Sequence, residues 1–144
     1  VEHLQSFVKA TEAAFDVHVT FPVIGDPTGD ALLQLGFVSP TAAFTDGGRA
    51  ASRGLILMDE LRTVKHAAEV ATSFGRNMNE VLRLLEALQM CRVYEVHTPA
   101  NWCAGEPVLV PTHVDEAAAE VAFPKGVFDI KPYLRVTPQP DAPF

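Results

Sequence analysis

The sequence is poor in cysteine and in basic residues, and it lacks any long apolar run. Its 144 residues hold two widely spaced cysteines, Cys91 and Cys103. They cannot form a disulfide framework, so we expect a reducing intracellular compartment, in the cytoplasm or an organelle. The net charge of −7 argues against nucleic-acid binding, because contacts to phosphates need a basic face. No stretch approaches the roughly 18 apolar residues of a membrane span, so we expect no transmembrane segment.

The histidines lack the spacing that metal sites favour. None forms a helical pair four residues apart or joins a CxxC-like motif, so we interpret all five as ordinary surface or core residues. Hydrophobic residues make up 48% of the chain and charged residues 20%, which is typical of a soluble globular protein of one ordinary domain. We expect no metal and no cofactor. The histidines are His3, His18, His66, His97 and His113.

The first third alternates between helical and β-type patterns. Apolar residues recur at helical spacing over residues 3–15 and predict an amphipathic helix. A β-rich run follows at 17–24, and 30–35 is predicted to be a short helix ending at Gly36. Residues 39–51 are rich in Pro, Gly, Ser and Thr, so we expect a surface loop there.

A strand pair and a long helix come next. The apolar run 54–58 suits a strand covered on both faces, and 63–70 should pair with it, although two alanines lower its β-propensity. Asn77 can cap the following helix, and Glu80 can reach back to the cap residue. The helix has an apolar stripe of Val81, Leu84, Leu85 and Leu88, while Arg83 and Glu86 are predicted to face water.

The segment after Cys91 is rich in proline, which prevents long regular elements. One short helix fits between residues 112 and 123, with Asp115 and Glu116 favourable in its first turn. The sequence therefore predicts an extended carboxy-terminal arm that lies on another surface.

Three parts of the chain carry a family resemblance: 75–89 (GRNMNEVLRLLEALQ), 98–102 (TPANW) with 105–108 (GEPV), and 123–128 (FPKGVF) with 133–140 (YLRVTPQP). Together they resemble the one-cysteine, type-6 branch of the peroxiredoxins. The resemblance implies an α/β, partial thioredoxin-like (peroxiredoxin) fold with an extended carboxy-terminal arm. Residues 1–92 would be the carboxy-terminal part of the thioredoxin-like domain. Residues 93–144 would be the dimerisation and arm region.

The resemblance also implies two site residues. Peroxiredoxins reduce hydroperoxides with a thiolate whose pKa is lowered by a helix N-terminus and a nearby arginine. Arg53 matches the active-site arginine of the family, and Arg76 matches a second arginine that supports the catalytic loop. An arginine suits this task because its charge is permanent and its planar fork offers several donors. Judged from spacing alone, both would be ordinary surface arginines.

The cysteines depart from the family pattern. The PxxxTxxC segment that carries the peroxide-attacking cysteine is absent from these residues. Two-cysteine relatives place a resolving cysteine where this chain has Thr98, so the resemblance sides with the one-cysteine branch. Cys103 lies after Trp102 and is no substitute by position. Cys91 ends an apolar helix, where a small packed residue is the favoured interpretation.

A second activity of the type-6 branch is not carried over. Its phospholipase site uses a Ser/His/Asp set, and the position of that aspartate is Leu61 here, with Asp59 close but out of register. The serine and histidine would lie in the missing portion.

Two hypotheses remain open. The chain is part of a working peroxiredoxin that reduces a hydroperoxide when the missing half is supplied, or it is a catalytically inactive structural or interaction subunit of a larger assembly. Under both, a half thioredoxin fold leaves a strand edge and an apolar sheet face unpaired. We therefore expect a homodimer or a heteromeric protein partner rather than a stable monomer.

Overall fold

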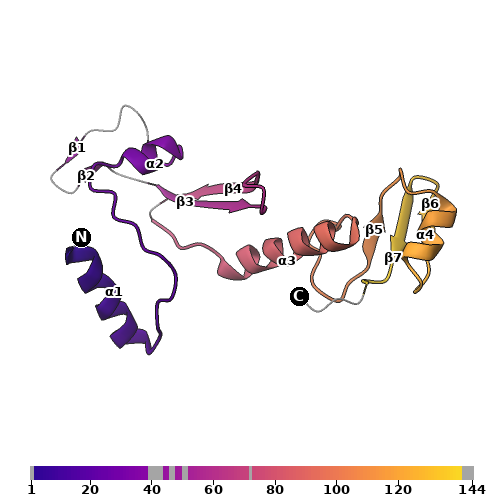
Figure 1. Cartoon of the computed structure of the whole chain (residues 1–144), viewed down its shortest axis with the longest axis horizontal. Helices are drawn as coiled ribbons and strands as arrows, with labels where there is room; N and C mark the ends of the chain where they lie inside the picture. Colours follow the sequence, from indigo (N-terminus) through magenta and orange to yellow (C-terminus); the bar gives the residue numbers. More distant parts are fainter. Residues whose placement is uncertain (1, 39–43, 46–47, 50–51, 72, 141–144) are drawn as a thin grey trace. The chain divides into compact units, whose positions relative to one another are not determined.

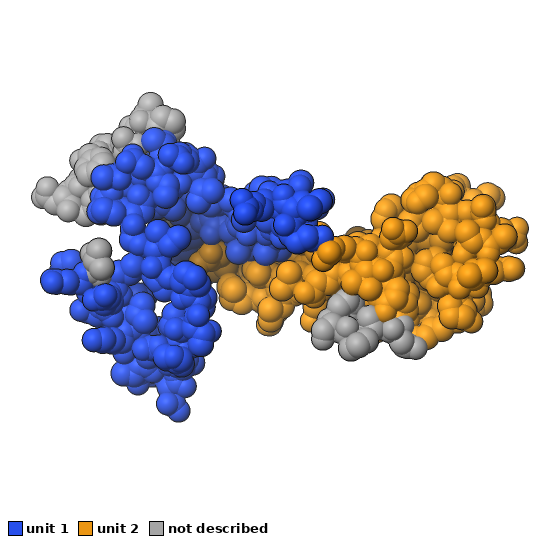
Figure 2. Space-filling view, viewed as in Figure 1, with its two compact units in different colours: residues 1–75 blue, residues 76–144 orange. Residues whose placement is uncertain are grey.

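The computed structural model describes residues 2–38, 44–45, 48–49, 52–71 and 73–140 (Figure 1). They belong to two compact units, Val1–Gly75 (unit 1) and Arg76–Phe144 (unit 2), drawn blue and orange in Figure 2. The predicted boundary between residues 92 and 93 falls inside unit 2 and stays a prediction about family regions. No helix among the described residues is long and apolar enough to cross a membrane.

Unit 1 begins with the predicted amphipathic helix, α1 (Glu2–Phe15), which contains no buried residue. The strand predicted at 17–24 is wrong, because this segment has no strand partner. The Val17 N–H donates to the Glu12 carbonyl at 3.3 Å, and the Val19 N–H donates to Glu12 Oε1 at 2.9 Å. These backbone N–H groups therefore donate to the last turn of α1 instead of to a neighbouring strand.

The predicted short helix and the predicted loop that follows it both correspond to short elements of the structure. The helix α2 (Asp30–Gln34) ends near Gly36 as predicted, and Gly36 has a φ of 79°, which suits glycine. Within the predicted loop 39–51, β1 (Phe44–Thr45) pairs with β2 (Gly48–Arg49). The rest of that loop lies outside the described residues.

The predicted strand pair is confirmed. β3 (Arg53–Met58) and β4 (Val64–Val70) form an antiparallel hairpin that is regular from Arg53 opposite Val70 to Leu57 opposite His66. The two alanines of β4 lie opposite Leu55 and Ile56, so cross-strand pairing overrides their weak propensity.

The expected cover of the apolar strand is not present within the described residues. All residues of β3 are half-buried or exposed, and Met58 is 57% exposed. Val38 is the one described hydrophobic residue of unit 1 that is buried. The described residues of unit 1 therefore form secondary structure without a buried core of their own.

Unit 2 begins with the long predicted helix, α3 (Met78–Tyr94). The Asn77 side chain caps it by accepting from the Glu80 N–H at 3.3 Å. Glu95, with a φ of 53°, ends the helix in the left-handed conformation. The buried residues Ala87 and Met90 mark the face of α3 that packs into the unit.

The predicted extended arm is instead a packed sheet and helix. β5 (Val108–Val110), β6 (Phe128–Lys131) and β7 (Leu134–Thr137) form an antiparallel sheet in the order β5-β7-β6, and α4 (Glu116–Ala122) joins β5 to β6. The helix lies within the predicted range 112–123, and its N-cap Asp115 accepts from the Ala118 N–H at 2.7 Å. The prolines keep these elements short, but short strands still pair.

The core of unit 2 surrounds Trp102, whose side chain is fully buried. Its indole N–H donates to the Glu106 carbonyl at 3.0 Å, which satisfies the polar group inside the core. The cluster around it comes from α3, the following turn, the sheet and α4. It contains Ala87, Met90, Val96, Val108, Val110, Ala119 and Phe123.

Candidate active-site arginines and thiols

Arg53 is the first residue of β3 and is exposed. Its Nη1 donates to the Phe74 carbonyl at 3.3 Å, so the guanidinium reaches the segment that follows β4. A guanidinium held by one hydrogen bond still presents further donors to an incoming anion. Arg53 therefore keeps donors that could bind an anion, and the active-site role that the resemblance implies for it stays a prediction.

Arg76 directly precedes the N-cap residue Asn77 and is exposed. It belongs to unit 2, whereas Arg53 belongs to unit 1. The two predicted site residues thus lie in different units. Their shared role in one active site stays a prediction.

Cys91 is half-buried near the end of α3. Its sulfur lies 4.0 Å from the Thr98 hydroxyl oxygen, the residue at the position of the resolving cysteine of two-cysteine relatives. A packed thiol facing a hydroxyl has no partner for a disulfide in that direction. The interpretation of Cys91 as a small packed residue fits this setting.

Cys103 is exposed in the turn after Trp102. Its backbone N–H donates to Glu106 Oε2 at 2.9 Å, and its sulfur lies 3.6 Å from the Asn101 carbonyl oxygen. Nothing in this turn places the thiol at the N-terminus of a helix, where a reactive thiolate is commonly stabilised.

Arg83 makes a contact that the sequence prediction missed. We expected it to face water, but it is half-buried, and its Nη1 donates to the Trp102 carbonyl at 3.0 Å. Two further bonds, of 2.6 and 2.7 Å, join it to the Glu80 carboxylate. The hydrogen bonds to Glu80 are the main cause that raises the pKa of Arg83, and partial burial acts in the opposite direction. The i,i+3 spacing of Glu80 and Arg83 was the available signal.

The Asp59 side chain stabilises the turn of the hairpin. Its carboxylate accepts from the N–H groups of Leu61 at 3.0 Å and Thr63 at 2.8 Å, and pairs with Lys65 at 3.2 Å. The hydrogen bond from Thr63 is the main cause that lowers the pKa of Asp59. Leu61, at the position of the family's phospholipase aspartate, has a 79% exposed apolar side chain. The Asp59 carboxylate is therefore engaged within the turn.

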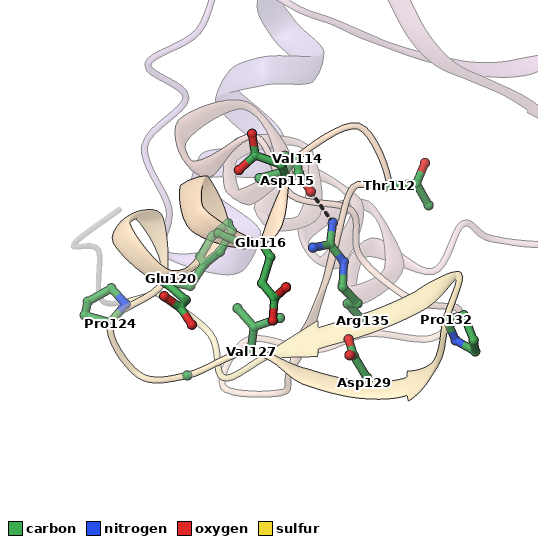
Figure 3. A pocket seen from close by; sticks show the side chains of 13 residues that line it. Thr112, Val114, Asp115, Glu116, Glu120, Pro124, Val127, Asp129, Pro132 and Arg135 are labelled. Carbon is green, nitrogen blue, oxygen red and sulfur yellow. Dashed lines mark hydrogen bonds between the residues drawn. The ribbon is translucent and has the colours of Figure 1, made fainter.

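A cavity of about 610 Å³ lies within unit 2 beside α4 and β7 (Figure 3). Arg135 crosses it and donates to the carbonyls of Pro111, at 2.9 Å, and Val114. These bonds hold the segment that leads into α4. No cysteine lines the cavity, and the described residues contain no cluster of three groups that could hold a metal ion.

The chain is homologous to the 1-Cys peroxiredoxins and to peroxiredoxin-6, and residues 87–125 match the C-terminal domain of 1-Cys peroxiredoxin. It is 38% identical to 1-Cys peroxiredoxin A of Oryza sativa subsp. japonica over 83% of this chain and 56% of that protein. It is 35% identical to the 1-Cys peroxiredoxin of Dictyostelium discoideum over 97% of this chain and 56% of that protein.

Solved structures agree with this α/β assignment. The structure aligns with a mutant of peroxiredoxin 6 of Arenicola marina at a TM-score of 0.83 and 27% identity, over 99% of this chain and 67% of that one. It aligns with a yeast mitochondrial 1-Cys peroxiredoxin at a TM-score of 0.81 and 27% identity, over 96% of this chain and 66% of that one. The chain spans little more than half the length of the rice and Dictyostelium relatives.

Proposed function

We propose that this chain takes part in the thiol-dependent reduction of hydroperoxides, as the carboxy-terminal portion of a 1-Cys peroxiredoxin. The observation that carries the proposal is Arg53, an exposed guanidinium at the start of β3 with one hydrogen bond to the Phe74 carbonyl. The homology to 1-Cys peroxiredoxins supplies the reaction class.

In this reaction a thiolate sulfur attacks one oxygen of the peroxide. The O–O bond breaks, the sulfur is oxidised to a sulfenic acid, and the other oxygen leaves as hydroxide or alkoxide and takes up a proton. Arg53 would stabilise the thiolate before attack and the negative charge on the leaving oxygen during it. Arg76 would support the loop that carries the reacting groups.

Neither cysteine of this chain suits the attacking role. Cys91 is half-buried against Thr98, and Cys103 lies in an exposed turn. The attacking thiol would therefore come from the portion of a 1-Cys peroxiredoxin that has no counterpart among these residues. Because Thr98 cannot form a disulfide, the sulfenic acid would be reduced by a thiol from outside this chain.

The second candidate is an interaction subunit without catalysis. The half-exposed apolar residues of β3 favour it, since an uncovered apolar strand stabilises a complex by becoming buried. Under this alternative, Arg53 would have no effect on peroxide turnover.

Peroxide consumption separates the two candidates. The chain is joined behind the amino-terminal portion of rice 1-Cys peroxiredoxin A that it does not match, and consumption is measured with dithiothreitol as reductant. We expect turnover that falls roughly 100-fold with Arg53→Gln, because a charge-stabilising donor is lost. The matched change Arg62→Gln, in the hairpin turn, should leave the rate unchanged. A folded fusion with no turnover, or equal rates for both variants, favours the interaction subunit.

A further inference from the structure

We propose that a second copy of this chain pairs with the edge strand β6 of unit 2, strand against strand in antiparallel orientation. The proposal is independent of the proposed function, because neither arginine assigned to peroxide reduction lies in this strand. The strand consists of Phe128, Asp129, Ile130 and Lys131.

β6 is the open edge of the sheet in unit 2. In the strand order β5-β7-β6, it pairs with β7 alone among the described residues. The other edge is occupied, because the backbones of His97 and Leu109 exchange hydrogen bonds of 2.9 and 2.7 Å beside β5. An unpaired edge presents N–H and C=O groups that can bind a further strand. Within the described part of unit 2, β6 is therefore the strand at which this sheet can be extended.

The side chains of β6 are exposed along its whole length. Phe128 is 58% exposed and Ile130 is 56% exposed, so two large apolar side chains are in contact with water. The pairing with β7 shifts register between Asp129 and Lys131, and Ile130 has no directly opposed residue on β7. A partner that covers Ile130 would bury apolar surface at the centre of the strand and so stabilise the complex.

The charges of β6 select a second copy and one register. When two antiparallel copies are centred on Ile130, Asp129 of each copy lies opposite Lys131 of the other, which gives two opposite-charge pairs. Moving the centre by one residue places Asp129 opposite Asp129, or Lys131 opposite Lys131, and is destabilising. Neither residue belongs to an ion pair within the residues that the structure describes. The strand is therefore complementary to itself in the register centred on Ile130.

The contact is short. Pro132 has no N–H to donate, so the strand ends after Lys131. A strand of four residues on each side is small beside the roughly 1,200 Å² of a stable interface. We therefore expect reversible association that depends on protein concentration.

Sedimentation velocity on the 144-residue chain tests the charge pairing. We expect a monomer–dimer equilibrium whose dissociation constant rises at least about tenfold with Asp129→Lys or with Lys131→Asp, because each change places like charges opposite one another. An equimolar mixture of the two variants should recover the dimer, since one strand is then positive and the other negative. The control Glu120→Lys, an exposed residue of α4, makes the same change in net charge and should dimerise like the unchanged chain.

Cross-linking tests the register without reversing a charge. In a Cys103→Ser background, which removes the exposed native thiol, Ile130→Cys places a thiol opposite its own copy, within the Cα separation of roughly 4.4–6.8 Å that a disulfide requires. Lys131→Cys is the matched control, because the two copies of this position lie on opposite sides of the centre. The disulfide dimer should form at least about tenfold faster with Ile130→Cys.

Three results would overturn the proposal. They are a chain that stays monomeric at about 1 mM, dimerisation that both charge reversals leave unchanged, and equal cross-linking rates for the two cysteine variants. The fluorescence of Trp102, in the core of unit 2, verifies that each variant is folded before it is compared.

Discussion

The Phe37 ring lies against Gly54 so closely that a Cβ atom at residue 54 would stand 2.2 Å from it. The same segment is fixed by backbone bonding, since the Ser52 N–H donates to the Phe37 carbonyl at 3.0 Å. Glycine at the second position of β3 is therefore a packing requirement, because any side chain would displace the aromatic ring.

Gly54→Ala should separate Phe37 from the hairpin. We expect a loss of about 1–3 kcal/mol of local stability, the usual cost of overpacking, seen as faster amide exchange at Ser52. Gly75→Ala is the matched control, because a Cβ there meets nothing within 4 Å. Unchanged exchange at Ser52 in the first variant would contradict the contact.

Met90→Ala should weaken unit 2. Met90 is fully buried beside Trp102, and removing such a side chain typically costs about 2–5 kcal/mol. The chain has one tryptophan, so urea unfolding followed by its fluorescence reports on this core directly. Leu82→Ala, on the same helix but 57% exposed, should shift the midpoint far less. Equal shifts would show that α3 does not pack through Met90.

The hairpin turn should respond to acid through Asp59. Its pKa is lowered in the folded state, mainly by the hydrogen bond from Thr63, so its contribution is complete above the unfolded value. The contribution is lost as the pH falls below the ordinary aspartate value of 3.8 and through the lowered pKa of the folded state. Amide exchange at Thr63, corrected for intrinsic rates, should accelerate in this range. Asp59→Asn should show fast exchange already at neutral pH, and an identical pH profile for both proteins would reject the assignment.

The two thiols should differ in accessibility. Cys103 is exposed, whereas Cys91 is half-buried against Thr98, so iodoacetamide should label Cys103 first in the native chain. Peptide mass spectrometry over a time course measures both rates, and labelling in urea provides the reference in which the rates converge. Faster native labelling of Cys91 would contradict its packed setting.

Local signals in the sequence were sufficient where the structure depends on local chemistry. The Asn77 cap, the glycine after α2 and the apolar run of β3 each predicted the element that is present. The prediction failed at 17–24, because a β-rich run forms a strand only with a partner, and the backbone there bonds to Glu12 instead. Strand pairing between distant segments also explains why the proline-rich region is a packed sheet and not an arm.

In the candidate site, too, local contacts were predictable from the sequence and contacts between distant residues were not. Arg53 and Arg76 were recognisable only by resemblance, since an exposed arginine has no distinguishing spacing. The contact of Arg83 with the Trp102 carbonyl joins residues 19 positions apart, and the sequence alone contained only its local pair with Glu80. Under the proposed function the thiol that Arg53 would serve lies outside these residues, so no pattern within them could identify it.

The distribution of buried residues has a consequence for synthesis. Unit 1 leaves the ribosome before unit 2, with Val38 as its one described buried hydrophobic residue, while the tryptophan-centred core lies in unit 2. At roughly 5–20 residues per second, residues 76–144 take about 3–14 s to follow. During that interval residues up to 75 exist without the tryptophan-centred core, so the best-packed part of the described chain is the last to form.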